Sequence, residues 1–331
     1  MRAGVIGGGG WGSAFAIHLG RLGISTRLWV REEEVFRELR KTRRNSLFLS
    51  GFYFPRSVSF TGDIREMAGC SEVIFIAVPS RYCRAIFSAI APDLSGSQVV
   101  VSLTKGIEEG TLKRMTEIMS EVFPRRGRPA LAVLSGPSFA REVAEKHPTA
   151  VVIASPDGAC AGEIQRLVSN IYFRAYTSRD VVGVELAGAA KNVIAIAAGI
   201  SDSLGAGHNS RAALITRGIA EMTRLGVKLG ARKETFLGLA GIGDLVLTCT
   251  ARLSRNYHVG FELGKGRRLQ QILGETKMVA EGVTTTVSVR NLARREGIEM
   301  PISEEVYRVL YENKSPRASL RDLMRRALKV E

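Results

Sequence analysis

A lysine inside a strongly apolar segment is the residue of this chain best suited to acid–base chemistry. Lys191 and Asn192 interrupt the run GVELAGAAKNVIAIAAGI at 183–200, which reads as a helix that is apolar on every side and therefore buried. Burial disfavours the charged form of an amine and moves its pKa towards neutrality, as a general acid or base requires. The alternative is a structural lysine that reaches solvent or pairs with a buried acid.

Polar groups further along the chain have the right chemistry to act with such a lysine. The run GLAGIGD places Asp244 at a glycine-flanked turn or helix start among apolar residues, an odd place for an acid without a partner. Ser254, Arg255 and Asn256 form a helix start with a serine cap and a guanidinium. Exposed N–H groups beside an arginine favour a phosphate ligand, and an ordinary cap beside a solvated arginine is the alternative.

The N-terminus carries a glycine pattern typical of dinucleotide binding. A short apolar strand at 3–7 leads into a GxGxxG sequence at Gly7, Gly9 and Gly12, and then into an amphipathic helix. Gly7 permits the tight turn, Gly9 lets the backbone approach a pyrophosphate, and Gly12 lets helix and strand pack closely. The anion is expected at the helix N-terminus.

A second strand, at 25–30, ends at Arg31, about 20 residues beyond the glycines, where an NAD-only site has a ribose-binding acid. Arg31 instead predicts pairing with a 2′-phosphate, so NADPH is favoured and NAD stays open. The acids at 32–34 are better explained as first-turn residues favoured by a helix dipole than as ribose ligands.

These residues need a fold that gathers the ends of strands. Further apolar strands, each followed by a helical stretch, are expected at 72–78, 98–104, 130–136 and 149–155. Such strands are typical of a Rossmann-like, doubly wound, mainly parallel sheet covered on both faces. Ligands bind beyond the carboxyl ends of these strands, where Lys105, Gly136 and Ser138 lie. A solvated loop charge is the alternative for Lys105.

The 331 residues, 45% hydrophobic and 24% charged, suggest two domains. Strands cease after 173–178, so we expect an α/β domain over 1–180 and an all-α domain over 181–331. No uncharged apolar run is long enough to span a membrane, and no integral membrane segment is expected. Four widely spaced cysteines argue against a metal site or disulfide framework and predict a reducing cytoplasm.

The chain is strongly basic, with a net charge of +15 and a pI near 10.1. Basic clusters lie at 37–44, at 125–128 and near the C-terminus. No aromatic-interleaved strand or recognition-helix pattern accompanies them, so nucleic acid is not expected as a partner. Solvated basic faces, with a field that attracts anionic substrates, are the preferred explanation.

The whole chain resembles the bacterial NAD(P)-dependent glycerol-3-phosphate dehydrogenases. The resemblance is carried in order by GGGGWGSAFA, RRNSLFLSG, AVPS, SLTKGIE, SGPSFAREVA, GAAKNVIAIAAGI, RAALITRGIAEM, GLAGIGDLVLTC, SRN, VAEGV and MPI. It implies reduction of dihydroxyacetone phosphate to sn-glycerol 3-phosphate, the precursor of phospholipids. It also implies that Lys191 protonates the C2 oxygen as hydride arrives, that Lys105 assists, and that Asp244 holds substrate and lysine.

The resemblance assigns two sets of binding residues. The implied substrate site comprises Lys105, Gly136, Ser138, Lys191, Asp244, Ser254, Arg255 and Asn256. The implied cofactor site, with the motif glycines, comprises Gly7, Gly9, Gly10, Trp11, Gly12, Arg31, Lys105, Ala140, Arg255, Val279 and Glu281. Gly10 stands where many members have a serine, and Ser203 stands where a glycine is common.

The sequence also leaves two competing functions and the assembly of the protein open. A related enzyme that reduces a 2-keto or 3-keto acid would use Arg255 to bind a carboxylate. A dinucleotide sensor or nucleic-acid-binding protein would have no use for Lys191 and Asp244 within apolar sequence. A small-molecule substrate is therefore expected, and a homodimer stays open.

Overall fold

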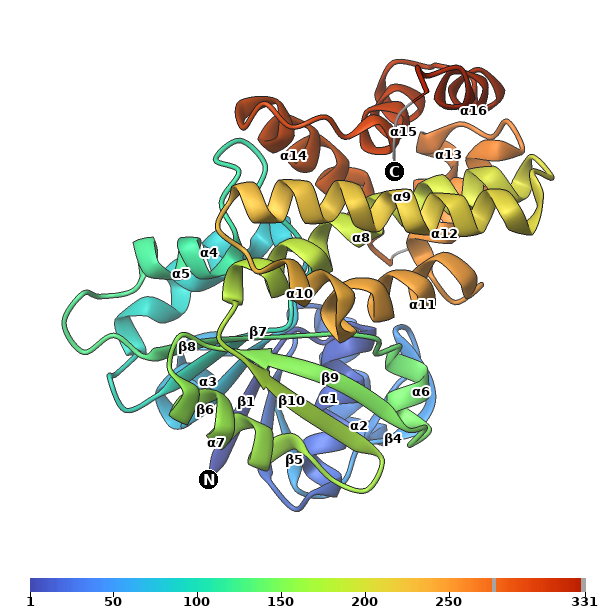
Figure 1. The fold of residues 1–331 in the computed structure, drawn as a ribbon. Helices are drawn as coiled ribbons and strands as arrows, with labels where there is room; N and C mark the ends of the chain where they lie inside the picture. Colours follow the sequence, from blue (N-terminus) through green and yellow to red (C-terminus); the bar gives the residue numbers. More distant parts are fainter. Residues whose placement is uncertain (276–277, 329–331) are drawn as a thin grey trace. The chain divides into compact units, whose positions relative to one another are not determined.

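The computed structural model describes residues 1–275 and 278–328 and divides the chain into two compact units (Figure 1). The first unit comprises 1–105 and 113–185, and the second comprises 106–112 and the residues from Leu186 onward. The short segment 106–112 therefore belongs to the second unit, although both of its flanks belong to the first. The domain boundary expected between 180 and 181 stays a prediction.

The first unit is built on an eight-stranded sheet in the order β10-β9-β8-β7-β6-β1-β2-β5. Its strands are β1 (Arg2–Ile6), β2 (Ser25–Trp29), β5 (Val58–Thr61), β6 (Val73–Ile76), β7 (Val99–Ser102), β8 (Ala130–Ser135), β9 (Thr149–Ala154) and β10 (Phe173–Ser178). From β5 through β1 to β8 the order is that of the Rossmann sheet, in which strand order reverses at the first strand. The predicted doubly wound, mainly parallel sheet is confirmed.

Strand β9 departs from the predicted parallel arrangement. It pairs antiparallel to β8, with Val133 opposite Ala154 and Ser135 opposite Val152. The next strand, β10, is parallel to β9, so both run against the other strands. The connection from β8 to β9 holds only the five-residue helix α6 (Ala140–Ala144). A parallel return needs a crossover that usually includes a full helix, so this shorter connection suits an antiparallel return.

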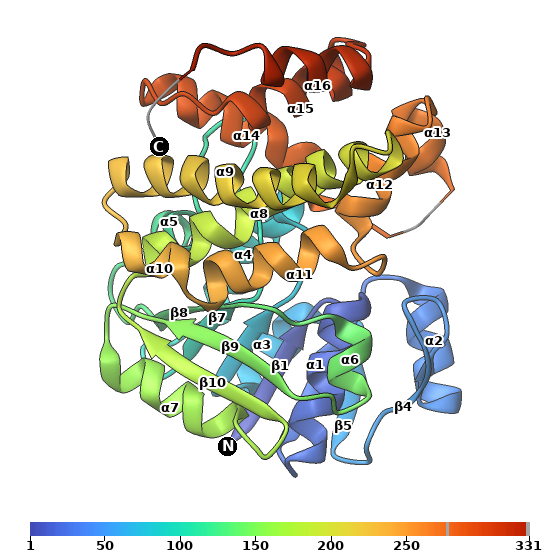
Figure 2. The same cartoon turned by 45° about the vertical axis from the view of Figure 1, so that its right-hand side comes forward.

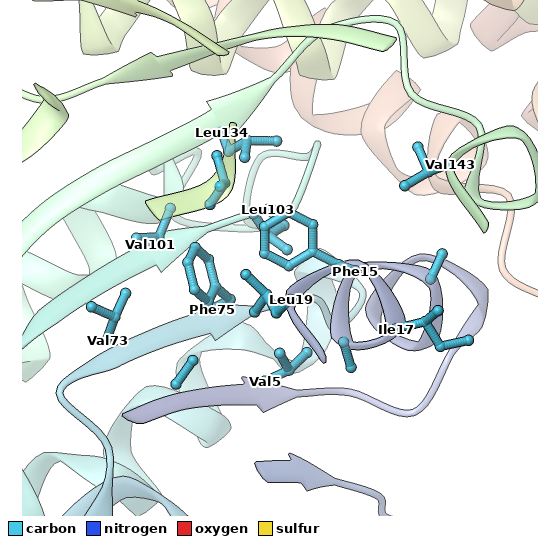
Figure 3. Close-up of a cluster of buried hydrophobic side chains, with 14 of the residues drawn as sticks. Val5, Phe15, Ile17, Leu19, Val73, Phe75, Val101, Leu103, Leu134 and Val143 are labelled. Atoms are coloured by element: carbon cyan, nitrogen blue, oxygen red, sulfur yellow. The ribbon is translucent and has the colours of Figure 1, made fainter. Parts of the chain in front are cut away.

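Apolar side chains cover both faces of the sheet. Along β6, Val73 and Phe75 join one buried cluster, whereas Ile74 and Ile76 join another. The two-residue period of a strand places these pairs on opposite faces. In the first cluster, shown in Figure 3, the rings of Phe15 and Phe75 meet edge to face with centroids 4.8 Å apart. The continuous apolar sequence of the strand is thus explained by cover on both sides.

The other helices of this unit are α1 (Gly10–Arg21), α2 (Glu33–Thr42), α3 (Ile64–Cys70), α4 (Ser80–Ile90), η1 (Ala91–Asp93), α5 (Met115–Val122) and α7 (Gly158–Val168). A separate antiparallel hairpin, β3 (Arg44–Asn45) and β4 (Leu49–Tyr53), follows α2. The sequence pattern does not predict β3, β4 or β5, because these strands are short and mix exposed with buried residues.

The described part of the second unit is helical, as expected. Its helices are α8 (Val181–Ser203), which begins in the first unit, α9 (Gly207–Lys228), α10 (Lys233–Leu237), the π-helix η2 (Leu239–Gly243), α11 (Asp244–Thr250), α12 (Arg255–Gly264), α13 (Leu269–Gly274), α14 (Glu281–Arg295), α15 (Pro301–Tyr311) and α16 (Pro316–Met324). Among the described residues, α8 alone has the length and hydropathy of a membrane span. Its most apolar stretch is 94% buried within the protein, as in a core helix.

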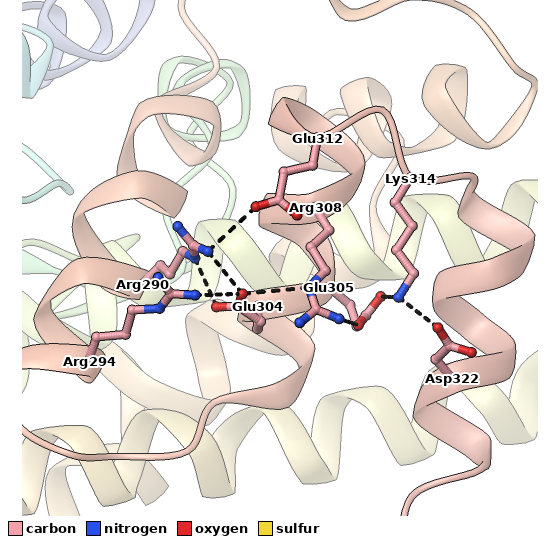
Figure 4. A network of polar contacts seen from close by, with 8 residues as sticks. All are labelled: Arg290, Arg294, Glu304, Glu305, Arg308, Glu312, Lys314 and Asp322. Atoms are coloured by element: carbon pink, nitrogen blue, oxygen red, sulfur yellow. Dashed lines mark hydrogen bonds and ion pairs between the residues drawn. The ribbon is translucent and has the colours of Figure 1, made fainter.

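Helices α14, α15 and α16 lie side by side (Figure 2) and share a network of ion pairs (Figure 4). Glu304 accepts from Arg290 at 2.9 Å and from Arg294 at 3.1 Å. Lys314 pairs with Glu305 at 2.6 Å and with Asp322 at 2.7 Å. The network drawn in Figure 4 has as many acids as bases, so it does not account for the excess positive charge of the chain.

A buried acid holds the start of α15. Glu221 of α9 is 2% exposed and accepts hydrogen bonds from the backbone N–H groups of Ile302 at 2.7 Å and Ser303 at 3.3 Å. These N–H groups lie in the first turn of α15, where no helical partner is available. Burial raises the pKa of Glu221 to about 7, and the hydrogen bonds from Ile302 and Ser303 act in the opposite direction.

The raised pKa of Glu221 predicts a specific dependence of stability on pH. Because its folded value of about 7 exceeds the ordinary 4.5, the stabilising contribution of Glu221 is fully present below pH 4.5 and is lost as pH rises through 7. Glu221→Gln keeps an acceptor for Ile302 and cannot ionise. We expect the melting temperature of this variant to fall less than that of the wild type between pH 4.5 and pH 7. Thermal unfolding at a series of pH values measures this difference.

The matched control for this test is Glu121→Gln, which removes an exposed acid whose pKa is lowered by hydrogen bonds to Lys113 and Arg84. It should not lessen the loss. A Glu221→Gln protein with the same pH slope as the wild type would show that Glu221 does not titrate in this range.

Candidate active site

The glycine loop lies between β1 and α1, at the carboxyl end of the strand where the sheet order reverses. Gly7 has a φ of +120°, and a Cβ there would lie 2.6 Å from the carbonyl oxygen of Ala77. A Cβ at Gly12 would lie 2.0 Å from the oxygen of Gly7, whereas a Cβ at Gly9 would meet no atom within 4 Å. The turn and the packing thus require Gly7 and Gly12. The space beside Gly9 is open, as close approach of a pyrophosphate requires.

The residues after the loop begin α1. A Cβ at Gly10, the first helical residue, would lie 3.0 Å from the carbonyl oxygen of Phe48 and 3.9 Å from the Cβ of Ala140. The glycine therefore allows the hairpin segment to approach the loop closely. The indole Nε1 of Trp11 is buried and finds no hydrogen-bond partner among the described residues. An unsatisfied donor beside a helix N-terminus fits a site that receives an anionic ligand.

Arg31 follows β2, the neighbour of β1 in the sheet. Its side chain is 59% exposed, its Nη2 lies 2.9 Å from the carboxylate of Glu32, and its guanidinium lies 5.0 Å from the centre of the Tyr82 ring. Further N–H donors of the guanidinium remain to serve a second anion. Of the acids at 32–34, Glu33 and Glu34 lie in the first turn of α2, as predicted, whereas Glu32 is the N-cap residue and pairs with Arg31.

Three of the predicted substrate residues meet at the carboxyl ends of β7 and β8. Lys105 Nζ donates to the carbonyl oxygen of Gly136 at 2.8 Å, and Ser138 Oγ donates to the same oxygen at 2.9 Å. Gly136 has a φ of +130°, and a Cβ there would lie 3.0 Å from the Cα of Val151. The glycine thus permits a turn that gathers an ammonium and a hydroxyl at the edge of the sheet where ligands bind.

In the second unit, the predicted buried lysine has a buried acid as its partner. Lys191 of α8 is 6% exposed and Asp244 is 1% exposed. Lys191 Nζ lies 2.8 Å from Asp244 Oδ1 and 2.7 Å from Thr248 Oγ1. Asp244 begins α11, and Thr248 follows one turn later on the same helix face. Because the Thr248 hydroxyl donates to the Asp244 carbonyl oxygen at 2.6 Å, its oxygen is left to accept from Lys191.

The surroundings of this pair exclude one alternative nucleophile. Cys249 is fully buried beside Thr248, and burial raises the pKa of its thiol to about 12. A thiol that stays protonated at neutral pH is a poor nucleophile.

The predicted helix start at Ser254 is confirmed. Ser254 is the N-cap of α12, and its Oγ accepts from the N–H of Tyr257 at 3.2 Å. Arg255, the first helical residue, has an exposed surface, yet the atoms crowded around its guanidinium lower its pKa, and the negative charge of Glu281 acts in the opposite direction. Val279 is partly buried two residues before Glu281. An arginine at a helix N-terminus can bind an anion together with the free N–H groups of that turn.

Asn256 joins this helix start to the lysine helix. Its Nδ2 donates to Asn192 Oδ1 at 2.8 Å, and its Oδ1 accepts from the N–H of Gly282 at 2.9 Å. A Cβ at Gly282 would lie 2.7 Å from the carbonyl oxygen of Asn192, so the start of α14 packs directly on α8. Asn256 therefore links the side chain of Asn192, the neighbour of Lys191, to the start of α14.

Thr248, Asn45 and Ser13 belong to these clusters and were not among the sequence candidates. Thr248 could have been found, because it follows Asp244 at the spacing of one helical turn. Asn45 donates to the carbonyl oxygen of Gly8 and to Ser13 Oγ, which lie 37 and 32 residues away in the sequence. Such a contact depends on the tertiary fold and leaves no local signal.

Known proteins match both halves of the chain. A family model described as the N-terminus of NAD-dependent glycerol-3-phosphate dehydrogenase matches residues 2–161, and the model of its C-terminus matches residues 180–321. The chain belongs to the NAD-dependent glycerol-3-phosphate dehydrogenase family. All of the site residues predicted from the sequence lie within the two regions that match the family models.

Individual relatives agree with this family. The chain is 53% identical over 330 residues to a glycerol-3-phosphate dehydrogenase (NAD(P)+) of Geobacter sulfurreducens, with 100% of this chain and 98% of the relative covered. It is 50% identical over 332 residues to that of Koribacter versatilis, at 100% and 98% coverage. The crystal structure of glycerol-3-phosphate dehydrogenase from Coxiella burnetii, 37% identical, matches with a TM-score of 0.94 and covers 98% of this chain and 99% of that one.

A nicotinamide dinucleotide suits this member of the glycerol-3-phosphate dehydrogenase family. The open space at Gly9, the unsatisfied Trp11 donor and the exposed Arg31 offer backbone, indole and guanidinium donors on one unit. Within the described residues, no group of three or more His, Cys, Asp or Glu side chains is placed to hold a metal ion.

Two glycine substitutions should separate cofactor binding from folding. Gly9 has an ordinary φ of −66° and open space at its Cβ, so Gly9→Ala should keep the melting temperature. It should weaken NADPH and NADH by about tenfold or more, because the methyl group occupies the approach of the pyrophosphate. Gly12→Ala should instead lower the melting temperature, since its Cβ clashes with the oxygen of Gly7. Cofactor titrations and thermal unfolding measure the two effects.

The matched control is Gly69→Ala, which adds a methyl group in open space on α3. It should leave cofactor affinity unchanged. Wild-type affinity in Gly9→Ala would show that the space beside Gly9 receives no ligand.

Proposed function

We propose that the protein interconverts dihydroxyacetone phosphate and sn-glycerol 3-phosphate, with NADPH or NADH as the hydride donor. The buried pair of Lys191 and Asp244 carries the proposal, because it places a proton donor in a chain of this family. The glycine loop supports the choice of cofactor, and the helix start at Ser254 supports a phosphorylated substrate. The product is a precursor for phospholipid synthesis.

The proposed cofactor site is built around the glycine loop. It comprises Gly7, Gly9, Gly10, Trp11, Gly12, Arg31, Lys105, Ala140, Arg255, Val279 and Glu281. When bound, the nicotinamide supplies the hydride. The loop glycines leave room for the pyrophosphate, and the N–H groups at the start of α1 are available to bind it. We propose that Arg31 favours NADPH by pairing with its 2′-phosphate.

Lys191 is the proposed catalytic acid. As hydride reaches C2 of the ketone, charge develops on the C2 oxygen, and Lys191 Nζ donates a proton to it. In the reverse direction the neutral amine accepts the proton of the C2 hydroxyl. Asp244 and Thr248 hold Nζ at 2.8 Å and 2.7 Å, which limits the motion of a flexible side chain. Lys105 is proposed to assist.

The proposed phosphate contacts come from the start of α12. Ser254, Arg255 and Asn256 offer a capped helix N-terminus and an exposed guanidinium. Lys105, Gly136 and Ser138 are proposed to contact the remainder of the substrate. The alternative activity, reduction of a small keto acid, would use Arg255 to bind a carboxylate instead.

The cellular setting is also a proposal. All four cysteines are free thiols, and three of them are buried. This supports a reducing cytoplasm. The assembly stays open between a monomer and a homodimer, and light scattering of the purified protein distinguishes them.

The activity is tested by following NADPH oxidation with purified protein and graded ketones. Dihydroxyacetone phosphate should be reduced, unphosphorylated dihydroxyacetone should react far more slowly, and 2-keto acids should not react. Faster turnover of a 2-keto acid would favour the alternative activity. Absence of turnover with every ketone, in protein that binds NADPH, would leave the chain a dinucleotide-binding protein without this reaction.

We expect Lys191→Met to remove nearly all turnover and to leave NADPH binding close to that of the wild type. General acid–base groups contribute about 10²- to 10⁴-fold to the rate, so kcat should fall by that factor. Loss of the ammonium also leaves Asp244 buried without its partner, which lowers stability. The double variant Lys191→Met/Asp244→Asn should recover melting temperature without recovering activity. If kcat falls by less than about tenfold, Lys191 is a structural residue and not the catalytic acid.

Arg31→Ala should distinguish the two cofactors. If the guanidinium pairs with the 2′-phosphate, affinity for NADPH should fall by about 10- to 100-fold while NADH is spared. Direct titration of both cofactors measures this, and Arg37→Ala, which removes an exposed arginine paired with Glu33 on α2, is the control. Equal weakening of NADPH and NADH would mean that Arg31 shapes the loop and does not contact the 2′-phosphate.

A further inference from the structure

A fully buried asparagine outside the GxGxxG sequence contacts the glycine loop. Asn45, at the end of β3, is 0% exposed. Its Nδ2 donates to the carbonyl oxygen of Gly8 at 2.7 Å and to Ser13 Oγ at 2.9 Å. Ser13 Oγ in turn donates to the Gly8 oxygen at 3.1 Å. Two donors from separate parts of the unit thus hold one carbonyl group of the loop.

The orientation of the Asn45 amide is fixed at both ends. Its Oδ1 accepts from the N–H of Phe48 at 3.1 Å, so the oxygen must face Phe48. The nitrogen must then face the Gly8 oxygen, which can only accept. If the amide were rotated by half a turn, its NH₂ group would face the N–H of Phe48. Its oxygen would then face the carbonyl oxygen of Gly8, and both hydrogen bonds would be lost.

The held carbonyl belongs to the peptide between Gly8 and Gly9, and it determines where the N–H of that peptide points. The structure contains no cis peptide in its described residues, so this peptide is trans. In a planar trans peptide the N–H points away from the side of the carbonyl oxygen. Fixing the Gly8 oxygen against Asn45 and Ser13 therefore directs the Gly9 N–H to the opposite side.

This peptide would turn easily without the two hydrogen bonds. Both of its residues are glycine, so no Cβ resists rotation of the peptide as a unit. A turned peptide would present a carbonyl oxygen in place of the Gly9 N–H. An oxygen repels an anion where an N–H would bind it, so the direction of this one peptide matters for a phosphate ligand.

We propose that Asn45, together with Ser13, is a positioning residue of the dinucleotide site that directs the Gly9 N–H towards the cofactor pyrophosphate. The inference rests on the proposed use of a dinucleotide, and it does not depend on which ketone is reduced. Asn45 acts through the loop and itself makes no contact with the reacting atoms. Because NADPH and NADH share the pyrophosphate, both cofactors depend on Asn45 equally.

Three ligands and three variants test this role without turnover. Asn45→Ala should weaken NADPH and NADH alike by about tenfold, and Ser13→Ala by about threefold, because one of the two donors remains. Asn45→Asp has nearly the same shape, but its carboxylate opposes the Gly8 oxygen and should weaken both cofactors most. Adenosine 2′-phosphate carries the adenosine and 2′-phosphate without a pyrophosphate. Its affinity should change by less than about twofold in all three variants.

A second asparagine of the same unit provides the structural control. Asn170 holds the turn before β10 by accepting from the N–H groups of Tyr172 and Phe173 at 3.0 Å and 2.8 Å. Asn170→Ala should lower the melting temperature and leave the affinity for both cofactors unchanged.

The outcomes separate positioning from a purely structural role. If Asn45→Ala loses melting temperature as Asn170→Ala does and binds both cofactors within about twofold of the wild type, the inference is overturned. Equal losses for adenosine 2′-phosphate and the dinucleotides would also overturn it. If the Asn45 variants do not fold, unchanged affinity in Ser13→Ala decides against it, and a selective loss decides for it. Wild-type protein that binds NADPH without reducing any ketone would contradict the proposed reaction alone.

Discussion

The buried pair of Lys191 and Asp244 ties helix α8 to helix α11 in the second unit. An ion pair removed from water gains little net stability, because the loss of hydration offsets the attraction between the charges. The helix that carries Lys191 also packs closely on α12: a Cβ at Gly199 would lie 2.1 Å from the carbonyl oxygen of Tyr257, and one at Gly260 would lie 2.0 Å from that of Ile196. Helices α8 and α12 therefore cross at nearly backbone contact, and the apolar sequence of α8 is the consequence. The π-helix before Asp244 is a form that often occurs at functional sites.

In the first unit, the shape of the candidate site depends on the backbone more than on charged side chains. Gly7, Gly12 and Gly136 each allow a turn or a close approach that a Cβ would block, and Gly9 leaves a space open. These glycines lie at the carboxyl edge of the sheet, the place where such sheets bind ligands. The glycine loop and the proposed acid Lys191 lie in different units. A variant that damages one function can leave the other intact, and direct cofactor binding separates them.

Much of this arrangement could be predicted from the sequence, because its causes are local. The apolar run around Lys191 requires burial, the GxGxxG spacing requires a turn into a helix, and the serine at 254 caps the next helix. What could not be predicted depends on contacts distant in sequence. The antiparallel direction of β9 follows from a short connection, and the holding of the glycine loop by Asn45 follows from where the hairpin folds. No local pattern encodes either feature.

The central claim, that Lys191 itself delivers the proton, is tested most directly by chemical rescue. Lys191→Ala leaves a cavity where the side chain was, beside the acceptors Asp244 and Thr248. Turnover of dihydroxyacetone phosphate by this variant should rise with the concentration of small primary amines. Among amines of similar size, the rescued rate should depend systematically on the pKa of the amine, as general acid catalysis requires. If no amine restores turnover although the variant is folded and binds NADPH, or if the rescued rate is independent of amine pKa, the proton comes from another group.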